Sequence, residues 1–291
     1  MRDFINETVR ALPPSGIRRF FNLASEMKDV VSLGVGEPDF LTPWNVREEA
    51  IYSLEKGRTV YTANAGLMEL RKELSHYLKR KYSLEYDPAS QLLITVGGSE
   101  AIDVALRTIL MPGDEVLIPE PSFVSYKPCA IMAGGKAVVV PLHGENGFKL
   151  TVRDLEGLVT EKTKVLVFPY PGNPTGATMS KKDMEELCRF ICEKDLFVLS
   201  DEIYAELTYD EPHTSIASMP GMYERTLVIN GFSKAFSMTG WRLGYAAGPK
   251  ELLEQMTKVH QFAIMCAPTT SQYAAIEALK NCDRAVEEMK Q

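Results

Sequence analysis

Short apolar runs alternate with amphipathic helical patterns along most of this chain of 291 residues. The runs are rich in β-branched residues and cover 92–96, 115–119, 136–142, 164–170, 196–203, 226–230 and 242–248. Continuous apolar strands separated by helices are typical of a parallel sheet that is buried on both faces. We therefore expect an α/β fold with a mostly parallel, seven-stranded sheet sandwiched by helices.

The segments between the runs predict helices and a domain division. Apolar residues recur at helical spacing from 99 to 110, with Ser99 as the expected N-cap. A second helix is expected after Ser180, because Asp183 follows three residues later, much like a capping box. Residues 1–45 are expected to form an irregular arm and part of a small domain, 46–270 a large domain, and 271–291 the helical start of a C-terminal small domain.

Composition excludes several classes of function. The formal net charge of −7 and the sequence pI of about 5.3 argue against nucleic acid as a partner, since phosphate backbones require a basic surface. No apolar run approaches the roughly 18 residues that span a bilayer, and the first residues lack an apolar signal region. The five cysteines form no C-x-x-C pair, which favours reduced thiols over a metal site. We expect a cytoplasmic protein that binds neither membrane nor metal.

Four polar clusters directly follow apolar runs. They are GGSEA at 97–101, PGNPTG at 171–176, Asp201 with Tyr204, and Ser233 with Lys234. Ligands of open parallel sheets bind at the carboxyl ends of the strands. The coincidence predicts that all four clusters line one binding site at the same edge of the sheet.

Each cluster taken alone has a plain structural reading beside the functional one. GGSEA is either a tight turn or a glycine turn before a helix whose free N–H groups suit a phosphate. PGNPTG is either an ordinary turn or a rigid frame that directs Asn173, and we expect the Asn173–Pro174 bond to be cis. Asp201 either caps a helix or pairs in the core, or it meets a buried cation supplied by a ligand.

Lys234 stands alone in a small-residue loop between two apolar runs. Partial burial near Arg242 and a positive helix end would lower the pKa of its ammonium. A neutral amine attacks carbonyls and forms Schiff bases. A ligand that joins lysine through an imine and carries both a phosphate and a protonatable ring nitrogen is pyridoxal 5′-phosphate (PLP). A nucleotide-phosphate loop is the weaker alternative, because G-x-x-x-x-G-K-[ST] is absent.

At this point the chain resembles the class I/II aminotransferases, which are PLP enzymes of fold type I. The resemblance rests on seven ordered segments: SLGVGEPDF (32–40), YTANAGLMELR (61–71), VGGSEAID (96–103), PSFVSY (121–126), PYPGNPTGATMS (169–180), SDEIYAEL (200–207) and GFSKAFSMTGWRLGY (231–245). Within the family the chain looks most like the bacterial alanine/aspartate-type enzymes. The resemblance implies a PLP-binding large domain and a small domain that is incomplete in this chain.

The resemblance also implies roles for individual residues. Lys234 matches the lysine that forms the Schiff base and carries the proton, Asp201 the partner of the pyridine nitrogen, and Tyr204 a catalytic donor to the phenolic oxygen. The other implied contacts are to the phenolic oxygen and substrate (Asn173), the pyridine face (Phe123), the phosphate (Gly98, Ser99, Ser233, Arg242) and the substrate (Gly36, Ile17). Some relatives carry a hydroxyl three residues before the lysine, where this chain has Gly231, so one phosphate contact is expected to be missing or moved.

Tyr61 matches a tyrosine that reaches the phosphate of the neighbouring subunit, which implies a homodimer with shared active sites. The implied arginine for the substrate α-carboxylate belongs to a C-terminal region beyond residue 291, and we expect the chain to be a fragment. The implied reaction is ping-pong transfer of an amino group between an amino acid and a 2-oxo acid. The alternatives are a PLP-dependent C–S β-lyase on the same scaffold and a PLP-sensing regulatory domain, and the substrate side chain stays open.

Overall fold

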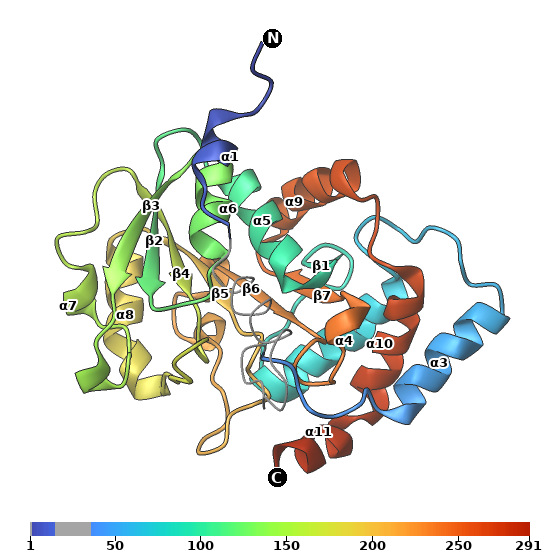
Figure 1. The fold of residues 1–291 in the computed structure, drawn as a ribbon. Helices are drawn as coiled ribbons and strands as arrows, with labels where there is room; N and C mark the ends of the chain where they lie inside the picture. The colour runs from blue at the N-terminus through green and yellow to red at the C-terminus, as the bar shows by residue number, and fades with distance from the viewer. Residues whose placement is uncertain (1, 15–35) are drawn as a thin grey trace, which may run out of the picture.

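The structure is a computed structural model that describes residues 2–14 and 36–291. Its centre is a seven-stranded sheet with the order β1-β7-β6-β5-β4-β2-β3 (Figure 1). Each strand falls on one of the apolar runs: β1 (Leu92–Thr95), β2 (Glu115–Glu120), β3 (Lys136–Pro141), β4 (Thr163–Phe168), β5 (Phe197–Asp201), β6 (Thr226–Gly231) and β7 (Gly244–Ala247). The predicted seven-stranded α/β sheet is confirmed.

Strand directions place most carboxyl ends at one edge. The four pairs among β2 to β6 (β3–β2, β2–β4, β4–β5 and β5–β6) are parallel. Strand β7 is antiparallel to both β1 and β6. Strand β1 therefore runs in the same direction as β6, and β7 alone points the other way within the sheet. The sheet is mostly parallel, as predicted, and the loops after β1, β4, β5 and β6 leave it on the same side.

Helices cover both faces of the sheet (Figure 1). They are α1 (Glu7–Ala11), α3 (Trp44–Glu55), α4 (Met68–Tyr82), α5 (Gly97–Ile109), α6 (Tyr126–Met132), α7 (Val152–Leu155), α8 (Lys181–Glu193), α9 (Lys250–Ala263), α10 (Thr269–Asn281) and α11 (Asp283–Lys290). Helices α5, α6 and α9 share one core cluster with the sheet, and α8 packs in another, on the opposite face. Within the described ranges, no helix is both long and apolar enough to cross a bilayer.

The strands bury alternate side chains on the two faces. In β4, Val165 and Val167 join the cluster under α5 and α9, whereas Leu166 and Phe168 join the cluster under α8. All four are almost completely buried. A period of two with apolar residues on both faces explains why the run is continuously apolar rather than alternating.

The predicted helix ends are partly right. Ser180 and Asp183 form the expected capping box at α8, with each side chain accepting the other's backbone N–H. Ser99, however, is not the N-cap of α5: the helix begins at Gly97 and Val96 takes the cap position. Gly97 has φ +76°, a conformation that glycine adopts easily, so the chain turns into the helix three residues earlier than the predicted cap at Ser99.

The N-terminal end of the chain differs from its predicted structure, whereas the C-terminal end agrees with it. The N-terminal arm is not irregular throughout, because Asn6 accepts backbone N–H groups and caps the short helix α1, which lies beside α6 (Figure 1). The segment after Lys250 is helical, as expected. Residue 270 lies inside α10, which packs on α3 and α4, and the division into domains stays a prediction.

Candidate active site

The four polar clusters meet in one cavity of about 390 Å³ at the carboxyl edge of the sheet. A cavity of this size is within the range of small-molecule sites. The lining includes residues from all four clusters and from two further loops: Gly98, Ser99, Asn173, Asp201, Tyr204, Ser233 and Lys234, with Gly36, Phe123 and Arg242. The convergence follows from strand direction, since these clusters follow β1, β4, β5 and β6.

Lys234 enters this cavity from the loop after β6. Its Nζ donates a hydrogen bond to the backbone carbonyl of Gly36 and lies 5.7 Å from the centre of the Tyr204 ring. Burial lowers the pKa of the Lys234 ammonium, Arg242 lowers it further, and Glu37 opposes both. The amine therefore loses its proton more readily than a solvated lysine, as nucleophilic chemistry requires.

Asp201 ends β5 and is 7 % exposed. The Tyr126 hydroxyl donates to Oδ2 at 2.7 Å, and the Ile203 amide donates to Oδ1 at 3.2 Å. Burial raises the pKa of the carboxyl; these two hydrogen bonds act against the rise, and the charge of Glu202 adds to it. Both hydrogen-bond partners found in the described ranges are neutral, so the site can accommodate a cation from a ligand.

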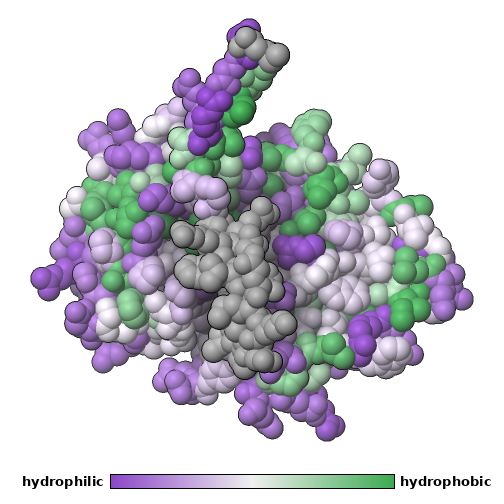
Figure 2. All heavy atoms as spheres, viewed as in Figure 1, coloured by the Kyte–Doolittle hydropathy of each residue, from purple (hydrophilic) through white to green (hydrophobic). Residues whose placement is uncertain are grey.

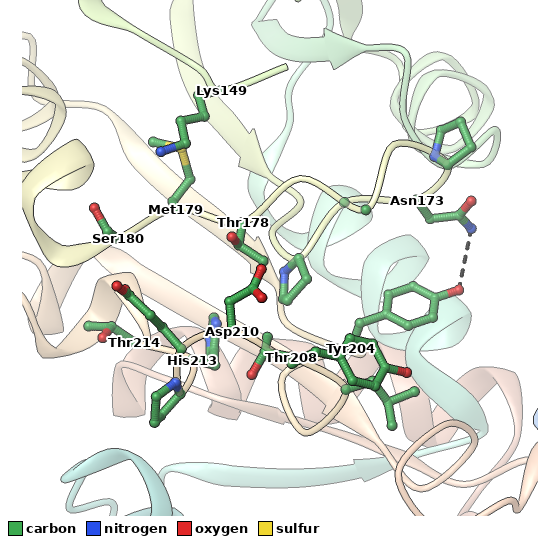
Figure 3. Close-up of a pocket in the computed structure, with 18 residues that line it drawn as sticks. Lys149, Asn173, Thr178, Met179, Ser180, Tyr204, Thr208, Asp210, His213 and Thr214 are labelled. Carbon is green, nitrogen blue, oxygen red and sulfur yellow. Dashed lines mark hydrogen bonds between the residues drawn. The ribbon is translucent and has the colours of Figure 1, made fainter. Parts of the chain in front are cut away.

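Asn173 and Tyr204 both line the cavity, and Figure 3, which draws the neighbouring hollow, shows their side chains pointing toward each other. Asn173 Nδ2 donates to the Tyr204 hydroxyl at 3.4 Å, and the Asn173–Pro174 peptide bond is cis, as predicted. Both residues also line a second hollow of about 780 Å³, whose wall includes Asp210 and His213. The two polar groups can therefore contact ligand atoms at the border between the hollows.

The other end of the cavity suits an anion. The first turn of α5 presents the backbone of Gly98 and Ser99, and the guanidinium of Arg242 lies against Gly97, where a Cβ would be 2.5 Å from Nη2. A Cβ on Gly244 would lie 2.6 Å from the backbone at Gly97 and Gly98. Helix N–H groups beside an arginine form a site that a phosphate prefers, and the close glycine contacts hold this turn in place.

Gly231, three residues before Lys234, packs closely on the neighbouring strand β7. A Cβ there would lie 2.9 Å from both the Gly244 Cα and the Leu243 carbonyl oxygen. A side chain at this position would therefore require β7 to shift. Ser233, two residues later, is buried and lines the cavity.

Three further predicted contacts involve Phe123, Tyr61 and Ile17. Phe123 lines the cavity and packs edge to face on Tyr126, with ring centres 5.7 Å apart. Tyr61 is 78 % exposed and lies beside another hollow, away from Lys234 of its own chain. Ile17 lies outside the described residues.

Sequence reasoning missed two buried residues near Asp201: Tyr126, which donates to its carboxylate, and Glu202, whose charge raises its pKa. Tyr126 stands three residues after Phe123 in PSFVSY, and Glu202 follows Asp201 directly. The buried Glu202 carboxylate accepts from the hydroxyls of Ser200 and Ser215 at 2.9 and 2.6 Å, and it lies 2.9 Å from His213 Nε2. The sequence signal for Glu202 is the pair of adjacent acidic residues, Asp201 and Glu202, directly after an apolar strand.

Comparisons with known proteins show the family. Residues 28–291 match the family model described as aminotransferase class I and II. The chain belongs to the class I and II aminotransferases. It is 55 % identical over 290 residues to the putative aminotransferase YugH of Bacillus subtilis, covering 100 % of this chain and 75 % of the relative.

Two further relatives agree with this assignment. The aspartate aminotransferase of Pyrococcus abyssi is 49 % identical over 95 % of this aminotransferase chain and 72 % of the relative. A Thermus thermophilus aspartate aminotransferase double mutant has a TM-score of 0.94 and 40 % identity, over 100 % of this chain and 77 % of that one. This class I/II aminotransferase is thus an enzyme of amino-group transfer with the PLP fold type I architecture.

The class I/II aminotransferases depend on PLP, and the site fits this cofactor on three observations. Asp201 is a buried carboxylate whose described partners are neutral. The turn at Gly97 and Gly98, beside Arg242, offers a cradle for a phosphate. Lys234 presents an amine of lowered pKa to the same cavity. A cation partner, an anion cradle and an amine are the three groups that PLP requires from a protein.

Proposed function

We propose that this aminotransferase moves an amino group between an amino acid and a 2-oxo acid by a ping-pong reaction in which Lys234 is the covalent anchor and proton carrier. The observation that carries the proposal is that Lys234 and Asp201, from different loops, line one cavity of about 390 Å³. The lowered pKa of Lys234 and the lack of a charged partner for Asp201 in the described ranges both support it.

The residues divide between holding the cofactor and moving protons. When bound, PLP supplies an aldehyde that joins an amine and a ring that accepts the electron pair left at the substrate Cα. Asp201 would stabilise positive charge at the ring nitrogen, and Asn173 and Tyr204 would donate to the phenolic oxygen. Gly98, Ser99, Ser233 and Arg242 would hold the phosphate, and Phe123 would cover the ring face.

Lys234 acts twice in this scheme. When the substrate amine takes its place on the aldehyde carbon, Lys234 would be released as a free amine, and as a neutral base it would then take the proton from the substrate Cα and hold it for return. Burial and the neighbouring Arg242 keep that amine neutral more often than in water. The Gly36 carbonyl accepts a hydrogen bond from Nζ and directs the amine into the cavity.

Replacing Lys234 by alanine tests this assignment. The Lys234→Ala enzyme is expected to lose turnover, and the absorbance of covalently held cofactor is expected to disappear. Lys164→Ala is the matched control, because Lys164 forms a surface ion pair with Asp114 and a bond to the Ile109 carbonyl, and neither partner lines the cavity. Retention of both turnover and absorbance in Lys234→Ala would refute the role of Lys234. Ammonia release without any 2-oxo acid acceptor would instead favour the C–S β-lyase.

Aspartate is the first amino donor to assay, because two of the compared enzymes are named aspartate aminotransferases. A donor panel with 2-oxoglutarate and pyruvate as acceptors defines the substrate pair. Gly36 and Asn173 line the cavity where the substrate would bind.

We also propose a cytoplasmic homodimer with shared active sites. Large apolar side chains are exposed on and after α3 (Trp44, Ile51, Leu54, Val60) and at and after the end of α9 (Phe262, Ile264, Met265). Figure 2 shows apolar groups on the surface near α3. Exposed apolar groups of this extent mark interaction surfaces. Tyr61 lies within the same region and would reach the partner's phosphate. A monomer mass in light scattering at micromolar concentration would contradict this proposal.

A further inference from the structure

The buried His260 pairs with the partly buried Glu100 next to the glycine turn of α5. One oxygen of Glu100 accepts the backbone N–H of Val96, the cap residue of α5. The other lies 2.7 Å from Nδ1 of His260 on α9. Since a carboxylate can only accept, Nδ1 carries the proton and donates it to this bond.

The Glu100 carboxylate fixes the start of the helix from one side. A helix leaves its first N–H groups without partners, and Glu100 takes the one at Val96. Gly244 and Arg242 press on the same turn from the other side, with no space for a Cβ at Gly97. The N–H groups that follow Val96 are thereby held at the border of the cavity.

His260 in turn determines where the carboxylate lies. Glu100 is only partly buried, so without a partner on α9 its side chain can rotate toward water and release Val96. A rotated carboxylate would also be free to approach the anion cradle, where like charges repel. The bond from His260 prevents both movements because it holds one oxygen toward α9.

We infer that His260 is a positioning residue for the cofactor phosphate, and that it acts through Glu100 on the turn at residues 96–99. The inference rests on the proposed function, since it assumes PLP in this cavity. His260 is not among the residues that line the cavity, so its effect is expected to fall on cofactor affinity rather than on the chemical step.

If His260 had only a structural role, His260→Leu would lower stability and leave cofactor affinity unchanged. A role in positioning the turn predicts the reverse. His260 is fully buried, and its Nε2 has no hydrogen-bond partner among the residues that the structure describes. A buried unpaired nitrogen costs stability, so an apolar replacement of similar size removes that cost along with the bond to Glu100. Stability is therefore expected to stay constant or rise in His260→Leu while cofactor affinity falls.

The experiment titrates apoenzyme with PLP and follows the absorbance of the bound cofactor. His260→Leu is expected to raise the dissociation constant about tenfold, as for loss of a hydrogen bond to a charged group, and His260→Gln, which keeps a donor, to stay within about twofold. Thr257→Val is the matched control on α9, since among the described residues the Thr257 hydroxyl donates only to the Leu253 carbonyl of the same helix. The melting temperature of each apoenzyme is measured in parallel.

A double mutant tests whether the effect passes through Glu100. Glu100→Ala is expected to raise the dissociation constant about as much as His260→Leu, with no further rise in the double variant. An unchanged constant in either single variant, or an equal rise in Thr257→Val, overturns the inference. If His260→Leu fails to fold, Glu100→Ala still decides. A wild-type enzyme that binds no PLP refutes the proposed function instead, so the two failures are distinguishable.

Discussion

Replacing Tyr126 by phenylalanine isolates one bond to the carboxylate that faces the cofactor ring. The Tyr126 hydroxyl donates to Asp201 Oδ2 at 2.7 Å, and both residues are buried. Phenylalanine keeps the ring that packs on Phe123 and removes only the hydroxyl. The variant therefore changes the electrostatics of Asp201 with little change in packing.

The magnitude follows from the small number of donors at Asp201. In the described ranges the carboxylate accepts from Tyr126 and from the Ile203 amide, so the variant removes one of two bonds. A hydrogen bond to a charged group contributes about 1.5–3 kcal/mol, and each 1.4 kcal/mol is about tenfold in an equilibrium constant. We expect kcat/KM to fall roughly tenfold to a hundredfold, because Asp201 must be an anion to stabilise positive charge on the ring.

The pH dependence has a definite sign. Burial raises the pKa of Asp201, and the hydrogen bond from Tyr126 acts against that rise. Without this bond the carboxyl becomes protonated at a higher pH than in the wild-type enzyme. The acid limb of the kcat/KM profile is therefore expected to move to higher pH in Tyr126→Phe.

Steady-state kinetics from pH 5 to 9 measure both effects. Tyr170→Phe is the control, because the Tyr170 hydroxyl is also buried but donates to the carbonyl of Phe148, outside the cavity around Lys234. The reasoning is wrong if Tyr126→Phe is folded and retains both the wild-type kcat/KM and the wild-type acid limb. It is also wrong if Tyr170→Phe loses as much activity.

Two further substitutions test the cradle and the core. Gly244→Ala places a methyl group 2.6 Å from the backbone of the glycine turn, and this overlap is expected to lower the free energy of unfolding by about 1–3 kcal/mol and to weaken PLP binding. An unchanged melting curve together with an unchanged PLP titration would contradict this. In Glu206, burial alone would raise the carboxyl pKa, but hydrogen bonds from Tyr82 and Tyr77 and the Lys81 charge bring it below its ordinary value. Glu206→Gln is therefore expected to be less stable than the wild type by roughly 2 kcal/mol near pH 7. This difference in stability is expected to shrink as the pH falls, because the wild-type carboxylate then becomes protonated. An equal difference at pH 4 and pH 7 would contradict this.

The sheet was predictable because its strands are buried on both faces. Val165 to Phe168 form an uninterrupted apolar run, and no helical or half-exposed pattern competes with it. The start of α5 was not predictable by the same means. Capping rules depend on side chains such as Ser99, whereas the helix is initiated by Gly97 at positive φ, a backbone property that sequence patterns reveal poorly.

The candidate site divides along a similar line. Lys234 and Asp201 stand out locally, because each is a charged residue at the end of an apolar run where burial would be costly without a partner. Tyr126 and His260 do not stand out, since an aromatic or a histidine in an amphipathic helix resembles ordinary core packing. Their roles depend on contacts with residues 75 and 160 positions away in the chain. Residues that carry the chemistry can therefore be predicted from unusual local sequence, whereas the residues that hold them in place can be identified only from contacts in the folded chain.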